Sequence, residues 1–204
     1  MSVLATLRPV SRSAGQLGRS VATWIVGLAA LIAFSAAALT SPTAPARAAA
    51  PACPHASAAP GQASLEELRH ATLCLLNHAR HGDPPLAFNH DLIHMARRHD
   101  KRMLAQDCFE HRCQGEARLE KRLRRSGYLD GADTWRYAEE LGYEATPAQM
   151  VSAWLDRDDP AADLLNPRYT AVGIGVRSGA PVAGVNGSKF VTYVIDLASR
   201  QPPG

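Results

Sequence analysis

The chain has 204 residues with 22 basic and 19 acidic side chains, but residues 1–48 hold four of the basic residues and no acid. Residues 49–204 therefore carry a net charge near −1, which gives no support to the binding of nucleic acid or another polyanion. Without residues 1–48, 156 residues remain. This length suits one domain and would be crowded as two.

Residues 1–48 have the pattern of a secretory signal. Residues 1–19 contain three arginines, and the uncharged stretch 20–45 that follows has a predominantly apolar centre. The Ala-Arg-Ala sequence at 46–48 offers small residues at alternate positions, so we expect cleavage after Ala48. The mature protein is then secreted, periplasmic or held in the cell envelope. The alternative is an uncleaved membrane anchor, because the apolar stretch approaches the roughly 20 residues of a spanning helix.

Four cysteines lie after the expected cleavage site: Cys53, Cys74, Cys108 and Cys113. An even number of cysteines in an exported chain favours two disulfides. We expect Cys53 to pair with Cys74, because an extended N-terminal arm can reach the first helix. Cys108 then pairs with Cys113 across a tight loop. The alternative is a metal cluster that adds His111 to these last two cysteines, but a structural zinc site needs four ligands.

The first half of the mature chain has helical periodicity. Residues 49–63 are rich in Pro, Ala, Gly and Ser and predict an extended arm. Ser64 and Glu67 form a capping-box pattern that begins a first helix, which we expect to continue to Gly82. Asn89 is the expected cap of a second helix. The predicted inward face of this helix contains Leu92, Met95, Ala96, His99 and Met103, with His99 as an interior histidine.

A third predicted helix, residues 116–126, is strongly basic. Its cations are Arg118, Lys121, Arg122, Arg124 and Arg125. We interpret them as a solvated surface. The alternative is contact with a membrane or an anionic polymer, since basic amphipathic helices bind such surfaces.

The last third of the chain changes from helical to strand periodicity. Thr146 is the expected cap of a fourth helix that begins at Pro147 and ends before Pro160. From residue 169 onward the apolar residues alternate, and 190–197 is rich in β-branched and aromatic residues, so both segments predict strands. Helices first and strands last predict an α+β domain in which helices cover a small antiparallel sheet.

Eight short segments, taken in order, carry a family resemblance. They are 75–80, 85–86, His99, 109–111, 122–128, 138–141, 154–155 and 164–175. Together they resemble the bacterial CAP domain of cysteine-rich secretory proteins, antigen 5 and pathogenesis-related 1 proteins, also called SCP-like. The resemblance covers roughly residues 65–197. It implies a three-layer α-β-α sandwich, usually secreted, with a shallow central cleft.

The resemblance also implies site residues. Many members line the cleft with two histidines and two acids, and some bind a divalent metal there. Matching the family's Phe-Ser-His to residues 109–111 places the first histidine at His111. Matching Gly-Glu-Asn to residues 138–140 places the first acid at Glu139, with Glu140 beside it.

The family's second histidine falls on Pro160, which has no side-chain lone pair for a metal. The metal site has therefore lost a ligand, unless a nearby carboxylate replaces it. The candidate replacements are Asp158, Asp159 and Asp163. A histidine and a glutamate alone form a hydrogen-bonded pair, whereas catalytic zinc needs three protein ligands and a water.

These features predict a non-catalytic secreted module that binds a lipid, glycan or protein at the cell surface through a cleft around His111, Glu139 and Glu140, without a resident cofactor. The alternative is a metal-dependent hydrolase in which His111, Glu139 and a nearby Asp hold a divalent metal such as zinc. We expect a monomer with no nucleic-acid partner, and membrane contact only if residues 1–48 stay attached. The expected organisation is signal peptide 1–48, arm 49–63, CAP domain 64–199 and tail 200–204.

A second histidine pattern competes with this site. His90 and His94 are four residues apart and face the same side of a helix, as in zinc proteases, with Asp91 where those enzymes have Glu. The shorter acid, the position at a helix start and the lack of a third ligand argue against a zinc protease.

Overall fold

The computed structural model describes residues 53–204. The predicted signal peptide and the alternative membrane anchor therefore lie outside the described residues. Within 53–204, no helix combines the length and the apolar character that crossing a bilayer requires.

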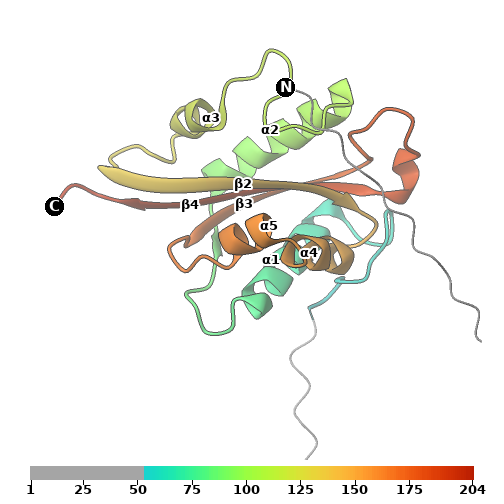
Figure 1. The fold of residues 1–204 in the computed structure, drawn as a ribbon, viewed down its shortest axis with the longest axis horizontal. Coiled ribbons are helices and arrows are strands. Elements are labelled where there is room, and N and C mark those ends of the chain that lie inside the picture. Colours follow the sequence, from blue (N-terminus) through green and yellow to red (C-terminus); the bar gives the residue numbers. More distant parts are fainter. Residues whose placement is uncertain (1–52) are drawn as a thin grey trace, which may run out of the picture. The chain divides into compact units, whose positions relative to one another are not determined.

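Helices and strands follow one another along the described chain. They are α1 (Leu65–Ala79), β1 (Ala87–Phe88), α2 (His90–Gln106), α3 (Leu119–Ser126), β2 (Thr134–Glu144), α4 (Pro147–Leu155), α5 (Asp158–Leu164), β3 (Ala171–Ser178), the 3-10 helix η1 (Gly187–Lys189) and β4 (Val191–Gln201). Figure 1 shows three layers, with α2 and α3 on one face of the sheet and α1, α4 and α5 on the other. This arrangement confirms the predicted α-β-α sandwich.

The four strands form one sheet in the order β1-β3-β4-β2. The β3–β4 pair is antiparallel, as predicted. The β4–β2 pair is also antiparallel, whereas the two-residue β1 pairs with β3 in parallel. The strand β2 was not predicted from the sequence. Its alternation is weak because β2 is an edge strand whose outer half is polar and exposed.

The predicted helix starts agree with the caps in the structure. Ser64 and Glu67 form both hydrogen bonds of a capping box, Asn89 accepts hydrogen bonds from the first turn of α2, and Thr146 accepts one from the first turn of α4. Each cap satisfies backbone N–H groups that have no partner inside the helix. Local hydrogen bonds therefore set these boundaries.

Other helix boundaries differ from the prediction. The first helix ends at Ala79, before Gly82, and the third begins at Leu119 rather than near 116. The segment after Asp156 was predicted as the end of helix 4, but it forms the additional helix α5. Pro160 is the third residue of α5. Backbone N–H groups in the first turn have no partner inside the helix, so proline is tolerated at this position. At the C-terminus, β4 continues to Gln201, into the segment expected to be a tail.

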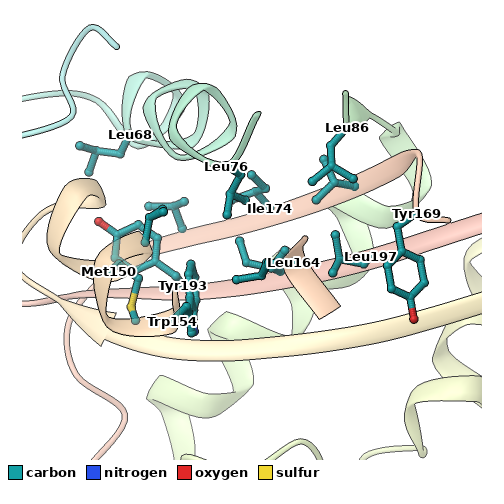
Figure 2. Packing of buried hydrophobic residues seen from close by; sticks show 14 of the residues in the cluster. Leu68, Leu76, Leu86, Met150, Trp154, Leu164, Tyr169, Ile174, Tyr193 and Leu197 are labelled. Atoms are coloured by element: carbon teal, nitrogen blue, oxygen red, sulfur yellow. The ribbon is translucent and has the colours of Figure 1, made fainter. Parts of the chain in front are cut away.

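The larger part of the core fills the space between the sheet and the layer of α1, α4 and α5. Figure 2 shows Leu68 and Leu76 of α1 and Trp154 of α4 meeting Ile174 of β3 and Tyr193 of β4. All five side chains are buried, and burial of such large apolar groups is the main favourable contribution to folding. This layer fixes the position of the sheet.

The opposite face of β3 carries glycines because α2 lies directly on its backbone. A Cβ at Gly173 would lie 2.1 Å from the carbonyl carbon of Leu92, and one at Gly175 would lie 2.7 Å from the carbonyl oxygen of Ala96. No side chain fits into these gaps. The close approach brings His99 of α2 over the sheet.

Both predicted disulfides are present. Cys53 pairs with Cys74 of α1, and Cys108 pairs with Cys113 across the loop after α2. The described residues contain no free cysteine. The second disulfide closes the loop that carries His111.

Candidate functional site

A buried group of charged side chains lies on the face of the sheet covered by α2 and α3. It comprises His99 of α2, Glu116 of the loop before α3, Arg122 of α3, Glu139 of β2 and Asp196 of β4, and we call it the Glu139 cluster. Glu139 and Asp196 are brought together because they are directly opposite one another in the β2–β4 pair. The cluster therefore combines five separate segments of the chain.

Arg122 lies at the centre of this cluster. Its Nη2 donates to both carboxylate oxygens of Glu139, at 2.8 and 2.7 Å, and to the backbone oxygen of His111 at 3.0 Å. Its Nη1 lies 3.7 Å from Glu116 Oε1. Charge-assisted contacts of this kind are stronger than neutral ones, especially away from water. The guanidinium thus supplies a positive charge between two buried acids.

The two histidines of the site differ in exposure. The imidazole of His111 is 64% exposed, and its Nδ1 lies 3.0 Å from Glu139 Oε1. His99 is fully buried, with Nδ1 2.8 Å from Glu116 Oε2 and Nε2 3.9 Å from Glu139 Oε1. The predicted pair of His111 and Glu139 is therefore in contact, and Nε2 of His111 is directed away from that contact.

The environment shifts the pKa values of these groups in opposite directions. Burial raises the pKa of Glu139, but the hydrogen bond with His111 and the charge of Arg122 outweigh it, so the net shift is downward. Burial, followed by the charge of Glu139, raises the pKa of Asp196 well above its ordinary value. Its surroundings therefore favour the protonated form of Asp196.

The histidine pKa values follow the same physics. Burial lowers the pKa of His99 more than the nearby acids raise it, so His99 is neutral. The hydrogen bond with Glu139 raises the pKa of His111, although partial burial opposes it. His111 therefore gains a proton more readily than His99.

Glu140 does not join the Glu139 cluster. Side chains alternate along a strand, and Glu140 is opposite Ile195, which belongs to the core beneath α1, α4 and α5. Burial and then the negative charge of Asp163 raise the pKa of Glu140 to about 7, while His111 lowers it. The structure therefore separates two acids that the sequence prediction placed in one cleft.

The other candidate ligands are also separated. Asp158 and Asp159 are exposed at the start of α5, and Asp163 lies near Glu140. His90 and His94 are exposed on α2 with their Nε2 atoms 3.0 Å apart, and they belong to no three-ligand group within 53–204. None of these side chains completes a metal site with His111.

Comparison with known proteins agrees with the architecture. The chain matches the cysteine-rich secretory protein family, abbreviated CAP, over residues 63–194, which is well over half of its length. The chain belongs to the CAP family. A search of curated proteins found no match.

Several solved structures are similar to this CAP domain. An outer surface protein from Borrelia burgdorferi is 15% identical, with a TM-score of 0.56, over 68% of this chain and 97% of that one. An extracellular protein with an SCP domain from Bacillus anthracis is 22% identical, with a TM-score of 0.48, over 65% of this chain and 39% of that one. A cysteine-rich secretory protein from Staphylococcus aureus is 18% identical, with a TM-score of 0.44 and coverages of 66% and 39%. The Borrelia structure supports the fold alone.

A divalent metal, which the CAP family implies, does not fit the residues present here. Both oxygens of Glu139 already accept hydrogen bonds from Arg122, and Pro160 offers no lone pair. Within 53–204, the triads of His, Cys or acidic atoms that could converge on an ion are Cys53–Cys74–His78 and His99–Cys113–Glu116. In both triads the cysteines are disulfide-bonded, and neither triad contains His111.

Glu116 and Asp196 were not among the predicted site residues, and Arg122 was predicted to be a surface cation. A signal was available for Asp196, which is the only acid in the apolar run 190–197. An acid in a buried strand needs a partner or a proton, so it indicates a polar site inside the CAP domain. Arg122 could not be distinguished from its basic neighbours by local pattern.

We expect Glu140→Gln to raise the urea midpoint of unfolding at pH 8 and to leave it near the wild-type value at pH 4. The folded-state pKa of about 7 lies above the ordinary 4.5, so ionised Glu140 costs stability as the pH rises through this interval. The amide removes that cost. Urea titrations from pH 4 to 8, with exposed Glu110→Gln as the matched control, measure the effect. A difference from wild type that is independent of pH would contradict it.

Proposed function

We propose that this CAP domain is a non-catalytic module that binds a lipid, glycan or protein ligand outside the cytoplasm. The observation that carries this proposal is the double hydrogen bond from Arg122 to Glu139. A general base or metal ligand needs an available lone pair facing the reactant. The Glu139 carboxylate is 0% exposed and is held by Arg122 and His111, so it braces the site instead.

The exposed atoms around the Glu139 cluster are suited to binding a ligand. His111 is fixed through Nδ1 by Glu139, which leaves its Nε2 for a hydrogen bond to a ligand. Two residues away, the ring of Phe109 is 42% exposed and packs edge-to-face on Tyr143, which packs in turn on Phe190. An apolar surface beside a polar anchor is the usual composition of a binding site.

The proposed location rests on the cysteines and the N-terminal pattern. Cys53–Cys74 and Cys108–Cys113 use every cysteine of the chain, and disulfides persist in oxidising compartments. Residues 1–48 have the composition of a secretory signal. An intact mass beginning near Ala49 in the extracytoplasmic fraction is the expected result, whereas a mass that includes residues 1–48 would support a membrane anchor.

Zinc binding tests the non-catalytic assignment. His90→Ala/His94→Ala serves as the background, because that exposed pair can bind zinc independently of the cluster. We expect isothermal titration of this variant with zinc to show no stoichiometric binding at micromolar metal, and His111→Ala on the same background to behave identically. Stoichiometric zinc that disappears with His111→Ala would overturn the proposal and favour the metal-dependent hydrolase.

A further inference from the structure

The surface between α2 and α3 contains two adjoining hollows. One of about 570 Å³ is lined by both helices, and the other, of about 960 Å³, is lined by α3, the preceding loop and Tyr137 of β2. They share the loop 115–117 and the side chain of Arg125. We call the two together the α2–α3 groove, and it lies on the side of the sheet shown with α2 and α3 in Figure 1.

Eight cations line the α2–α3 groove besides Arg122, which is engaged by Glu139. They are Arg98, Lys101, Arg102, Arg112, Arg118, Lys121, Arg124 and Arg125. Two acids also line it, but Glu116 is engaged by His99 and Arg122 beneath the surface, and Glu120 is paired with Arg124. Within 53–204, only Arg102 and Arg124 of the eight have a carboxylate within 4.0 Å. Six cations therefore face the groove without an acidic partner.

The overall charge conceals this concentration. Residues 97–126 contain ten basic and five acidic side chains, whereas the rest of 49–204 contains eight basic and fourteen acidic ones. The near-neutral total thus arises from two opposite surpluses in different parts of the chain. A cleft lined by one sign of charge raises the local concentration of ligands of the other sign.

The groove favours a polymer over a single small anion or a bilayer. Its cations extend over two hollows, so one headgroup cannot contact them all, whereas repeated anionic groups along a chain can. Six of the eight are arginines, whose planar forks match the oxygens of phosphate, sulfate and carboxylate groups. A bilayer contact would need a row of apolar side chains beside the cations. Of the large hydrophobic residues that are exposed within 53–204, only Tyr137 lines the groove.

Tyr137 adds a feature suited to sugars. Its ring is 36% exposed at the edge of the hollow beside α3 and offers a flat, rigid surface with a polar tip. We propose that the α2–α3 groove binds a linear anionic glycan, with arginine forks on its charged groups and Tyr137 against a sugar ring. This proposal concerns a surface separate from the recognition face around Phe109 and the Nε2 of His111.

A heparin dodecasaccharide is a suitable probe, titrated calorimetrically into the purified protein. With about four anionic groups engaged, affinity should fall about 50-fold between 50 and 200 mM salt. Lys121→Glu/Arg125→Glu is expected to weaken binding at least 10-fold at 50 mM salt. Arg168→Glu/Lys189→Glu makes the same charge change at exposed positions outside the groove and should change affinity less than 2-fold.

Three outcomes would overturn the proposal: no binding of heparin at 50 mM salt, equal losses in the two double variants, or binding to phosphatidylglycerol vesicles but not to heparin. Equal urea midpoints for the two double variants establish that both are folded. His111→Ala should retain wild-type heparin affinity. A loss of heparin affinity in His111→Ala would show that the glycan binds at the His111 face. That result would overturn the groove proposal but support a ligand-binding function.

Discussion

Arg122→Ala is expected to lower the free energy of unfolding by about 3–5 kcal/mol, since it removes one partner of a buried ion pair. The guanidinium contacts Glu139 through two hydrogen bonds and lies near Glu116. Its removal leaves these carboxylates inside the domain without a compensating charge. Urea unfolding at pH 7 measures the loss.

Arg124→Ala provides the matched control for this prediction. Arg124 is on the same helix, but it is half exposed and forms a surface pair with Glu120, so its loss should cost less than about 1 kcal/mol. The double variant Arg122→Ala/Glu139→Gln should lose less than the sum of the two single variants, because the uncompensated charge is absent. Additive losses would show that Arg122 does not neutralise Glu139.

Trp154→Ala is expected to lower the free energy of unfolding by a similar amount, about 3–5 kcal/mol. The side chain is fully buried between α4 and the sheet, and its ring packs edge-to-face on Tyr193. Its Nε1 also donates to the backbone oxygen of Leu141 at 3.0 Å. The substitution therefore creates a cavity and removes an anchor of β2, the strand that carries Glu139.

Trp154→Phe separates these two contributions. It keeps most of the buried ring and removes the hydrogen bond to Leu141, so the expected cost is about 1–2 kcal/mol. Trp135 is half-buried on β2, outside the main core, so Trp135→Ala controls for the loss of a tryptophan as such. Amide exchange in β2 should accelerate more for Trp154→Ala than for Trp135→Ala. Equal exchange rates would contradict an anchoring role for the indole.

The two proposed binding surfaces have a common support. Arg122 donates to the backbone oxygen of His111, and the same α3 helix presents Lys121 and Arg125 to the α2–α3 groove. The inward side of α3 thus braces the His111 loop while its outward side remains charged. A ligand on either surface would contact residues held in place by the Glu139 cluster.

The sequence alone determined the features that depend on near neighbours. The caps at Ser64, Asn89 and Thr146 begin helices where expected, because a side chain and the N–H groups it binds are a few residues apart. The two disulfides followed from the number and spacing of the cysteines. The ordered segments of the CAP resemblance identified the family and the sandwich.

Only the tertiary structure decided what the candidate site contains. Arg122 and Arg124 are two residues apart in one basic helix, yet one neutralises a buried acid and the other is half exposed and pairs with Glu120 at the surface. Glu139 and Glu140 are adjacent, yet they point to opposite faces because β2 is a strand. Such assignments depend on which distant segments pack together, and neither charge nor helical periodicity encodes that packing. The sequence already shows the surplus of basic residues in 97–126, but only the packing of α2 against α3 shows that their side chains line one groove.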